Sequence, residues 1–114
     1  MRNIAELKME SVTSASQSSV FVNTSCDLCT VQVFGTATAM KVQVQGMTDI
    51  ASETWEDLAV FNMSDLSLIE GDDGITEAGI YSVMVEGVTQ VRINVASVTG
   101  SLNVTAKFAD TSAQ

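Results

Sequence analysis

The chain has 114 residues, 46% of them hydrophobic, and a formal net charge of −9 at pH 7. This length predicts one domain with its own core, and the hydrophobic content excludes a chain that is disordered throughout. The segment from Asp49 to Glu77 holds nine acids and no Lys or Arg, and the rest of the chain is neutral. Such a protein repels phosphate backbones and anionic lipid, so we expect no nucleic-acid partner and no membrane partner. We interpret the acidic segment as a solvated face, with a specific cation or partner site as the alternative.

The first 18 residues differ in composition from the rest. Ile4, Leu7 and Met9 stand among charged residues with weak helical patterning, and residues 11–19 are small and polar. We therefore predict a flexible N-terminal arm over residues 1–18, a compact domain over 19–110 and a C-terminal tail over 111–114. The chain has neither a signal peptide nor an apolar run that could span a membrane. We thus expect synthesis in a cytoplasm, where the protein either stays or leaves by a route such as assembly into a particle.

Two cysteines, Cys26 and Cys29, form the sequence Cys-Asp-Leu-Cys. A zinc site needs four ligands, and the chain has no His and no further Cys, so carboxylates would have to complete it. A redox motif should stand at the start of a helix, whereas this pair leads into a predicted strand. We predict two structural thiols, with metal binding or redox chemistry as the alternative.

From Val20 onward, apolar and polar residues alternate with the period of two that is typical of β-strands. The last three strands have short connections, which require antiparallel pairing. We predict an all-β fold, an antiparallel β-sandwich of seven or eight short strands in which a jelly-roll arrangement is one option. The predicted strands cover residues 20–22, 30–34, 39–45, 55–62, 66–69, 80–86, 90–96 and 102–108.

The residue types argue against catalysis. Without His, neither a Ser-His-Asp nor a Cys-His centre can form within one chain, and paired carboxylates need a deep cleft that a small sandwich rarely builds. We predict a protein that is not an enzyme, with no catalytic residue, no cofactor-binding residue and no metal ligand. The segment Glu70-Gly71-Asp72-Asp73-Gly74 offers oxygen ligands that suit Ca²⁺ but lacks the EF-hand spacing. We interpret it as an acidic turn and leave cation binding open.

Trp55 and Tyr81 are the single Trp and the single Tyr. Exposed aromatic rings can stack on sugars, so either residue could mark a carbohydrate-binding module. Trp55 opens an apolar strand, and an anchor in the core or at its rim is the simpler interpretation.

The order of several segments resembles a group of small β-sandwich proteins from the structural gene blocks of tailed phages. In that group a G-T-x-x-x-A hairpin, a segment with W-x-x-L and an I-T-x-A-G-x-Y segment recur in this order. The corresponding residues here are 33–39, 42–46, 54–58, 75–81, 85–87 and 91–100. The chain departs from the pattern at residues 47–53, where the group has an Asp-Gly turn, and this departure puts any loop function there in doubt.

The resemblance implies a virion structural protein without catalysis or cofactor. A charge of −9 is unfavourable beside packaged DNA, which favours the capsid exterior. We therefore expect a capsid decoration (cement) protein that binds the major capsid protein or other virion proteins through Ile4, Leu7 and Met9 of the arm. By analogy with phage head proteins we expect a homo-oligomer, a trimer. The alternatives are a tail or fibre component with a receptor-binding role, and a carbohydrate-binding module.

Overall fold

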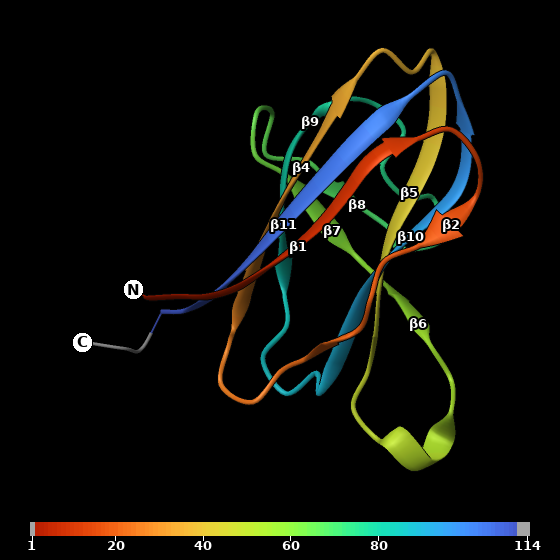
Figure 1. Cartoon of the computed structure of the whole chain (residues 1–114). Coiled ribbons are helices and arrows are strands. Elements are labelled where there is room, and N and C mark those ends of the chain that lie inside the picture. Colours follow the sequence, from red (N-terminus) through yellow and green to blue (C-terminus); the bar gives the residue numbers. More distant parts are fainter. Residues whose placement is uncertain (1, 112–114) are drawn as a thin grey trace.

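Two antiparallel sheets pack face to face in the computed structural model, which describes residues 2–111 (Figure 1). The first sheet has the strand order β1 (Arg2–Val12), β11 (Leu102–Asp110), β4 (Leu28–Gly35), β9 (Gly79–Met84), β7 (Val60–Asn62) and β8 (Leu68–Ile69). The second has the order β2 (Ser16–Gln17), β10 (Gln90–Thr99), β5 (Ala39–Met47) and β6 (Glu56–Leu58), and β3 (Phe21–Val22) also pairs with β10. A short 3-10 helix, η1 (Ile50–Ser52), lies in the connection that projects between β5 and β6 (Figure 1). The predicted all-β sandwich is confirmed.

The core forms between the inner faces of the two sheets. Alternate residues of each long strand are buried there, as the period of two predicts, and their neighbours face solvent. The buried residues of the first sheet include Val31, Val33, Val83, Leu102 and Phe108, and those of the second include Val42, Val44, Val91, Ile93 and Val95.

The N-terminal segment differs from the predicted arm. Strand β1 pairs with β11 along its length, from Arg2 opposite Asp110 to Val12 opposite Leu102. Register shifts between Asn3 and Ala5 and again before Val12 interrupt the strand, and they disguise its alternation in the sequence. The domain therefore begins within the predicted arm and not at residue 19. The predicted tail lies outside the described residues except for Thr111.

The predicted strand over residues 55–62 is two strands in different sheets. Strand β6 pairs with β5 in the second sheet, whereas β7 pairs with β9 and β8 in the first, so the chain crosses the sandwich at Ala59. The apolar run over residues 58–61 gives no sign of such a crossing in the sequence. The sheet that each half of the segment joins depends on residues far away in the sequence.

Tyr81 is fully buried and fixes the entry into β9. Its hydroxyl donates a hydrogen bond to the carbonyl oxygen of Glu77, four residues earlier, at 2.7 Å. This arrangement is the tyrosine corner of Greek-key sandwiches. Burial, with the nearby charges of Glu77 and Asp65, raises the pKa of Tyr81. Within residues 2–111 there is no helix long and apolar enough to cross a membrane.

Candidate binding surfaces

The three residues predicted to bind a partner do not form one surface. Leu7 and Met9 are each only 8% exposed and belong to the core, because they point from β1 toward the second sheet. Ile4, at 37% exposure, is the one member of the set at the surface. The predicted contact through an ordering arm is therefore corrected: the arm is already a strand of the domain.

Cys26 and Cys29 are buried, and no disulfide joins them. Burial, with a smaller effect of Cys26, raises the pKa of Cys29 to about 12. Its thiol is then protonated at neutral pH, whereas metal binding and nucleophilic attack both require the thiolate. These observations agree with the predicted structural role of the two residues.

The acidic turn brings three carboxylates together. Oxygen atoms of Glu70, Asp72 and Asp73 lie within 4.8 Å of one another, and all three residues are exposed. The backbone N–H groups of Asp73 and Gly74 donate to the carbonyl oxygen of Glu70, so the turn is closed by its own hydrogen bonds. The sequence predicts this arrangement, an acidic turn with exposed carboxylates.

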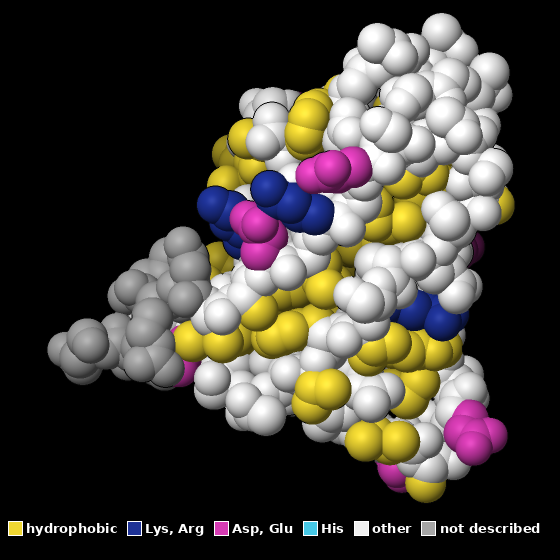
Figure 2. All heavy atoms as spheres, in the orientation of Figure 1, with side chains coloured by type: hydrophobic (Ala, Val, Ile, Leu, Met, Phe, Trp, Pro, Cys, Tyr) yellow, Lys and Arg dark blue, Asp and Glu magenta, His cyan; other side chains and the backbone are white. Residues whose placement is uncertain are grey.

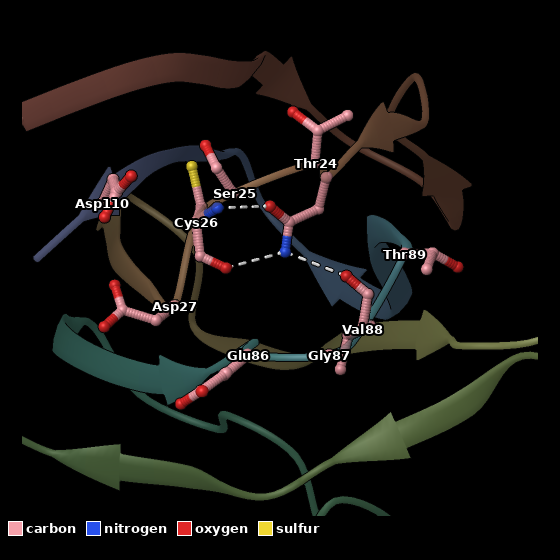
Figure 3. Close-up of a pocket in the computed structure, with 10 residues that line it drawn as sticks. Thr24, Ser25, Cys26, Asp27, Glu86, Gly87, Val88, Thr89 and Asp110 are labelled. Carbon is pink, nitrogen blue, oxygen red and sulfur yellow. Dashed lines mark hydrogen bonds between the residues drawn. The ribbon is translucent and has the colours of Figure 1, made fainter. Parts of the chain in front are cut away.

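A polar pocket of about 320 Å³ lies at the end of the sandwich where the β3–β4 and β9–β10 connections meet (Figure 3). The Asn23 side chain donates to the carbonyl oxygens of Cys26, Val85 and Val88 at 2.9–3.0 Å and accepts from the Cys26 N–H at 2.8 Å. On the rim, the Asp27 carboxylate accepts hydrogen bonds from the hydroxyl and the backbone N–H of Thr111, which lower its pKa. These polar groups bind the chain's own loops.

An apolar surface lies on the outer face of the first sheet, over β7, β8 and β9. Phe61 stands opposite Leu68 on one side and Ser82 on the other, so these residues share the solvent face. A depression of about 380 Å³ opens there between Leu58, Ala59, Phe61, Leu68, Ser82 and Met84. Among the residues that the structure describes, six of the eleven exposed large hydrophobic residues belong to these strands or to the β7–β8 turn, and we call them the β7–β9 patch: Phe61, Met63, Leu66, Leu68, Ile80 and Met84.

The opposite end of the same outer face is charged. Lys8 and Lys107 lie 3.6 and 3.8 Å from the carboxylate of Glu6. Figure 2 shows side chains of both signs gathered over β1 and β11. It also shows hydrophobic side chains on the side of the sandwich below β1. Val20 and Val22, in and next to β3, are exposed as well.

The two aromatic residues considered for sugar binding lie in different surroundings. Tyr81 is in the core and cannot meet a ligand. Trp55 is half-buried at the outer face of the second sheet, and the guanidinium carbon of Arg92 lies 4.3 Å from the centre of its ring. Only Trp55 is placed where a ligand could reach it.

A family model described as XepA matches residues 5–108. The chain belongs to the XepA family. Among solved structures, the "SPBc2 prophage-derived protein YomS" is similar with a TM-score of 0.73 and 22% identity, over 91% of this chain and 92% of that one. The "PBSX exported protein XepA" is similar with a TM-score of 0.77 and 19% identity, over 91% of this chain. The chain spans only 37% of the length of that XepA structure, and no curated protein matches the sequence.

The XepA family match begins inside β1 and ends inside β11. The family domain therefore includes most of the strand that we expected to be an arm. Together with the similarity to a prophage-derived protein, the match supports a phage-related protein, as the resemblance of the sequence motifs implied.

Proposed function

We propose that this protein is a structural protein of a phage particle that binds the outer surface of the capsid as a decoration protein. The β7–β9 patch makes the contact in this proposal. The observation that carries it is the presence of six large exposed apolar side chains in this part of the fold, four on β7, β8 and β9 and two in the turn between β7 and β8. Exposed apolar patches of this kind mark interaction sites in otherwise soluble proteins.

Acidic residues next to the patch indicate the chemistry of the partner. Asp65 precedes Leu66 at the turn, and Glu70 directly follows β8. A second copy of the chain would bring the same charges to the same place, and like charges across an interface are costly. The patch instead fits a capsid surface with apolar residues inside a rim of Lys and Arg.

The expected homo-oligomer remains part of the proposal, with contacts away from the β7–β9 patch. Val20 and Val22, in and next to β3, are exposed apolar residues that could supply such a contact, and neither belongs to the acidic segment over residues 49–77. A native mass of three chains by light scattering would support the trimer. A monomeric mass at high protein concentration would contradict it.

Binding to purified capsids of the encoding phage tests the proposed contact. The variant Leu66→Asn removes an apolar side chain that is 70% exposed at the tip of the patch, in a backbone conformation that asparagine tolerates. We expect co-sedimentation to weaken roughly tenfold, the loss that removal of one well-placed apolar contact gives. The control Ile50→Thr alters an apolar residue of η1 that is 60% exposed and lies outside the patch, and it should bind normally. Equal binding of wild type and Leu66→Asn, or no binding of the wild type, would contradict the proposal.

A second candidate function rests on the similarity to an exported protein. In this alternative the chain acts outside the cell that makes it and is not bound to particles. Fractionation of a phage-producing culture distinguishes the two. Protein that moves with intact particles through a density gradient supports decoration, and labelling on the tail would support a tail or fibre component. Free protein in the medium supports the exported alternative.

A further inference from the structure

The outer face of the second sheet carries a row of planar polar side chains that runs across four strands. The strand register places Arg92 opposite Gln45, and Asn94 between Gln43 and Gln17, on the face opposite the buried valines. Asp57 stands opposite Gln45 on the next strand, and Trp55 leads into that strand. We call this set the amide face: Gln17, Gln43, Gln45, Trp55, Asp57, Arg92 and Asn94.

Hydrogen bonds join these side chains into one network. Arg92 donates from Nε to Gln45 Oε1 at 2.8 Å and from Nη1 to Gln17 Oε1 at 3.2 Å. Gln45 and Gln43 each donate from Nε2 to the Asp57 carboxylate, at 2.8 and 3.1 Å. Asn94 donates to Gln43 Oε1 at 3.1 Å. Each amide therefore has a fixed orientation before any ligand arrives.

Arg92 also holds the aromatic ring of the face. Its guanidinium carbon lies 4.3 Å from the centre of the Trp55 ring, a distance at which a cation is attracted to the π-system. The indole is thus fixed beside the hydrogen-bonding groups and not free to turn. A rigid aromatic ring next to oriented polar groups is an arrangement that binding sites use.

A sheet face that only meets water has no need for this composition. Asn and Asp are depleted in strands, where they cost stability, and solubility is served by Lys, Glu and Thr. The outer face of the first sheet carries Gln32 and Asn103 among Thr30, Thr105 and the Lys107–Glu6 ion pair, but no hydrogen bond joins amide side chains to one another among its described residues. The contrast between the two outer faces of one sandwich indicates that the amide face is built to bind.

We propose that the amide face binds a neutral hexose unit of an oligosaccharide or polysaccharide. Planar amide, carboxylate and guanidinium groups can each pair with neighbouring hydroxyl groups, and an indole can stack on the apolar face of a pyranose ring. Within the network Arg92 balances Asp57, while the whole chain carries −9. A neutral ligand avoids the repulsion that the protein exerts on an anionic polymer such as a nucleic acid.

This site is independent of the proposed function, since it lies on the opposite outer face from the β7–β9 patch. Capsid binding can therefore fail while sugar binding holds, and the reverse. The two readouts also differ, because the only Trp of the chain belongs to the amide face.

Fluorescence of the single Trp tests the proposal on the full chain. The probes are maltotetraose, cellotetraose, chitotetraose and β-1,4-galactotetraose, each titrated to about 10 mM, a range that detects the weak affinities of small neutral ligands. We expect a saturable change in emission with at least one of them, and a matching heat of binding by calorimetry. If none of the four gives a saturable signal by either method, the proposal is overturned.

Two variants assign the binding to the network. Arg92→Lys keeps the charge but loses the planar fork that holds Gln45 and Gln17, and Gln45→Ala removes the link to Asp57. We expect roughly tenfold weaker binding for each, with a normal urea midpoint. The control Thr105→Ala, on the other sheet, should bind as the wild type does. Unchanged affinity in both network variants would exclude the amide face as the site.

Discussion

Replacing Asn23 by alanine tests whether one buried amide holds together the end of the sandwich at which the β3–β4 and β9–β10 connections meet. The side chain is 8% exposed and makes four hydrogen bonds to backbone groups of the two connections. Alanine leaves the Cys26 N–H and the carbonyl oxygens of Cys26 and Val85 without this partner in a buried site. The Val88 carbonyl oxygen is only partly buried, so it can accept a hydrogen bond from water instead.

The magnitude follows from these three buried groups. Each lost hydrogen bond costs about 1 kcal/mol net, and more where the group left behind is shut away from water. Asn23→Ala should therefore lower the free energy of unfolding by about 3 kcal/mol. With a urea dependence of about 1–3 kcal/mol per molar, the midpoint of urea unfolding should fall by roughly 1–3 M. Circular dichroism in the β region would follow the transition.

A second substitution separates hydrogen bonding from volume. Asn23→Asp keeps the shape, but its carboxylate would face three carbonyl oxygens and could donate to none of them. Folding would raise the pKa of the new carboxyl above its unfolded value, so the penalty is full at neutral pH and shrinks as the pH falls through the folded pKa. We expect the difference in stability from wild type to be smaller at pH 5 than at pH 7.

Three measurements test this account of Asn23. Thr24→Ala, at an exposed neighbour, should shift the free energy of unfolding by no more than about 0.5 kcal/mol. A loss below about 1 kcal/mol for Asn23→Ala would mean that water replaces the amide, and would refute its organising role. A stability difference for Asn23→Asp that does not depend on pH would refute the electrostatic part.

Three further predictions concern stability. Tyr81→Phe removes the hydroxyl bond to Glu77 and should cost about 1 kcal/mol, measured by urea unfolding. In Gly71→Ala the new methyl group would lie 2.2 Å from the carbonyl oxygen of Asp57, so we expect a loss of about 1–3 kcal/mol, and an unchanged melting temperature would contradict the tight packing. Deletion of residues 1–18 removes β1 and its buried side chains, and should abolish cooperative melting. A soluble deletion variant with a near-normal melt would restore the arm interpretation.

The sequence predicts most of the long strands because one face of each is in the core and the other is in water. Val91, Ile93 and Val95 alternate with Arg92 and Asn94 without interruption, and the structure has them on opposite faces of β10. The same alternation of apolar and polar residues does not identify strand β1. Its bulges displace Ile4 from the period of Leu7 and Met9, and the spacing of the three then imitates a helix.

The binding surfaces are harder to predict than the strands, because they depend on the pairing of distant residues. Phe61 and Met84 alternate with buried residues and face outward, but only the pairing of β7 with β9 brings them to the same sheet face. The amide face has the same difficulty. Gln45 and Arg92 can be predicted to point outward, but their hydrogen bond joins residues 47 positions apart. Only the register between β5 and β10 brings them together.

At Leu66 the backbone conformation that the fold requires can be distinguished from the side chain that binding would require. Within residues 2–111, three residues other than glycine have positive φ: Ser11, Glu53 and Leu66. Ser11 stands at the bulge of β1, where its N–H donates to Asn103, and Glu53 caps η1. Each of these two conformations therefore has a local structural cause.

The turn at residues 62–67 also requires a left-handed residue, since the Leu66 N–H donates to the Asn62 carbonyl at 2.9 Å and Leu66 has a φ of 62°. Nothing in the turn requires leucine, which adopts this conformation at a cost of about 1 kcal/mol, whereas Gly or Asn adopts it readily. The side chain is 70% exposed, so packing does not offset the cost. The proposed capsid contact accounts for an exposed leucine in an unfavourable backbone conformation, because the partner would cover its side chain. Leu66→Asn should therefore raise the free energy of unfolding while it weakens binding, and a variant that loses both would show that the leucine serves the fold.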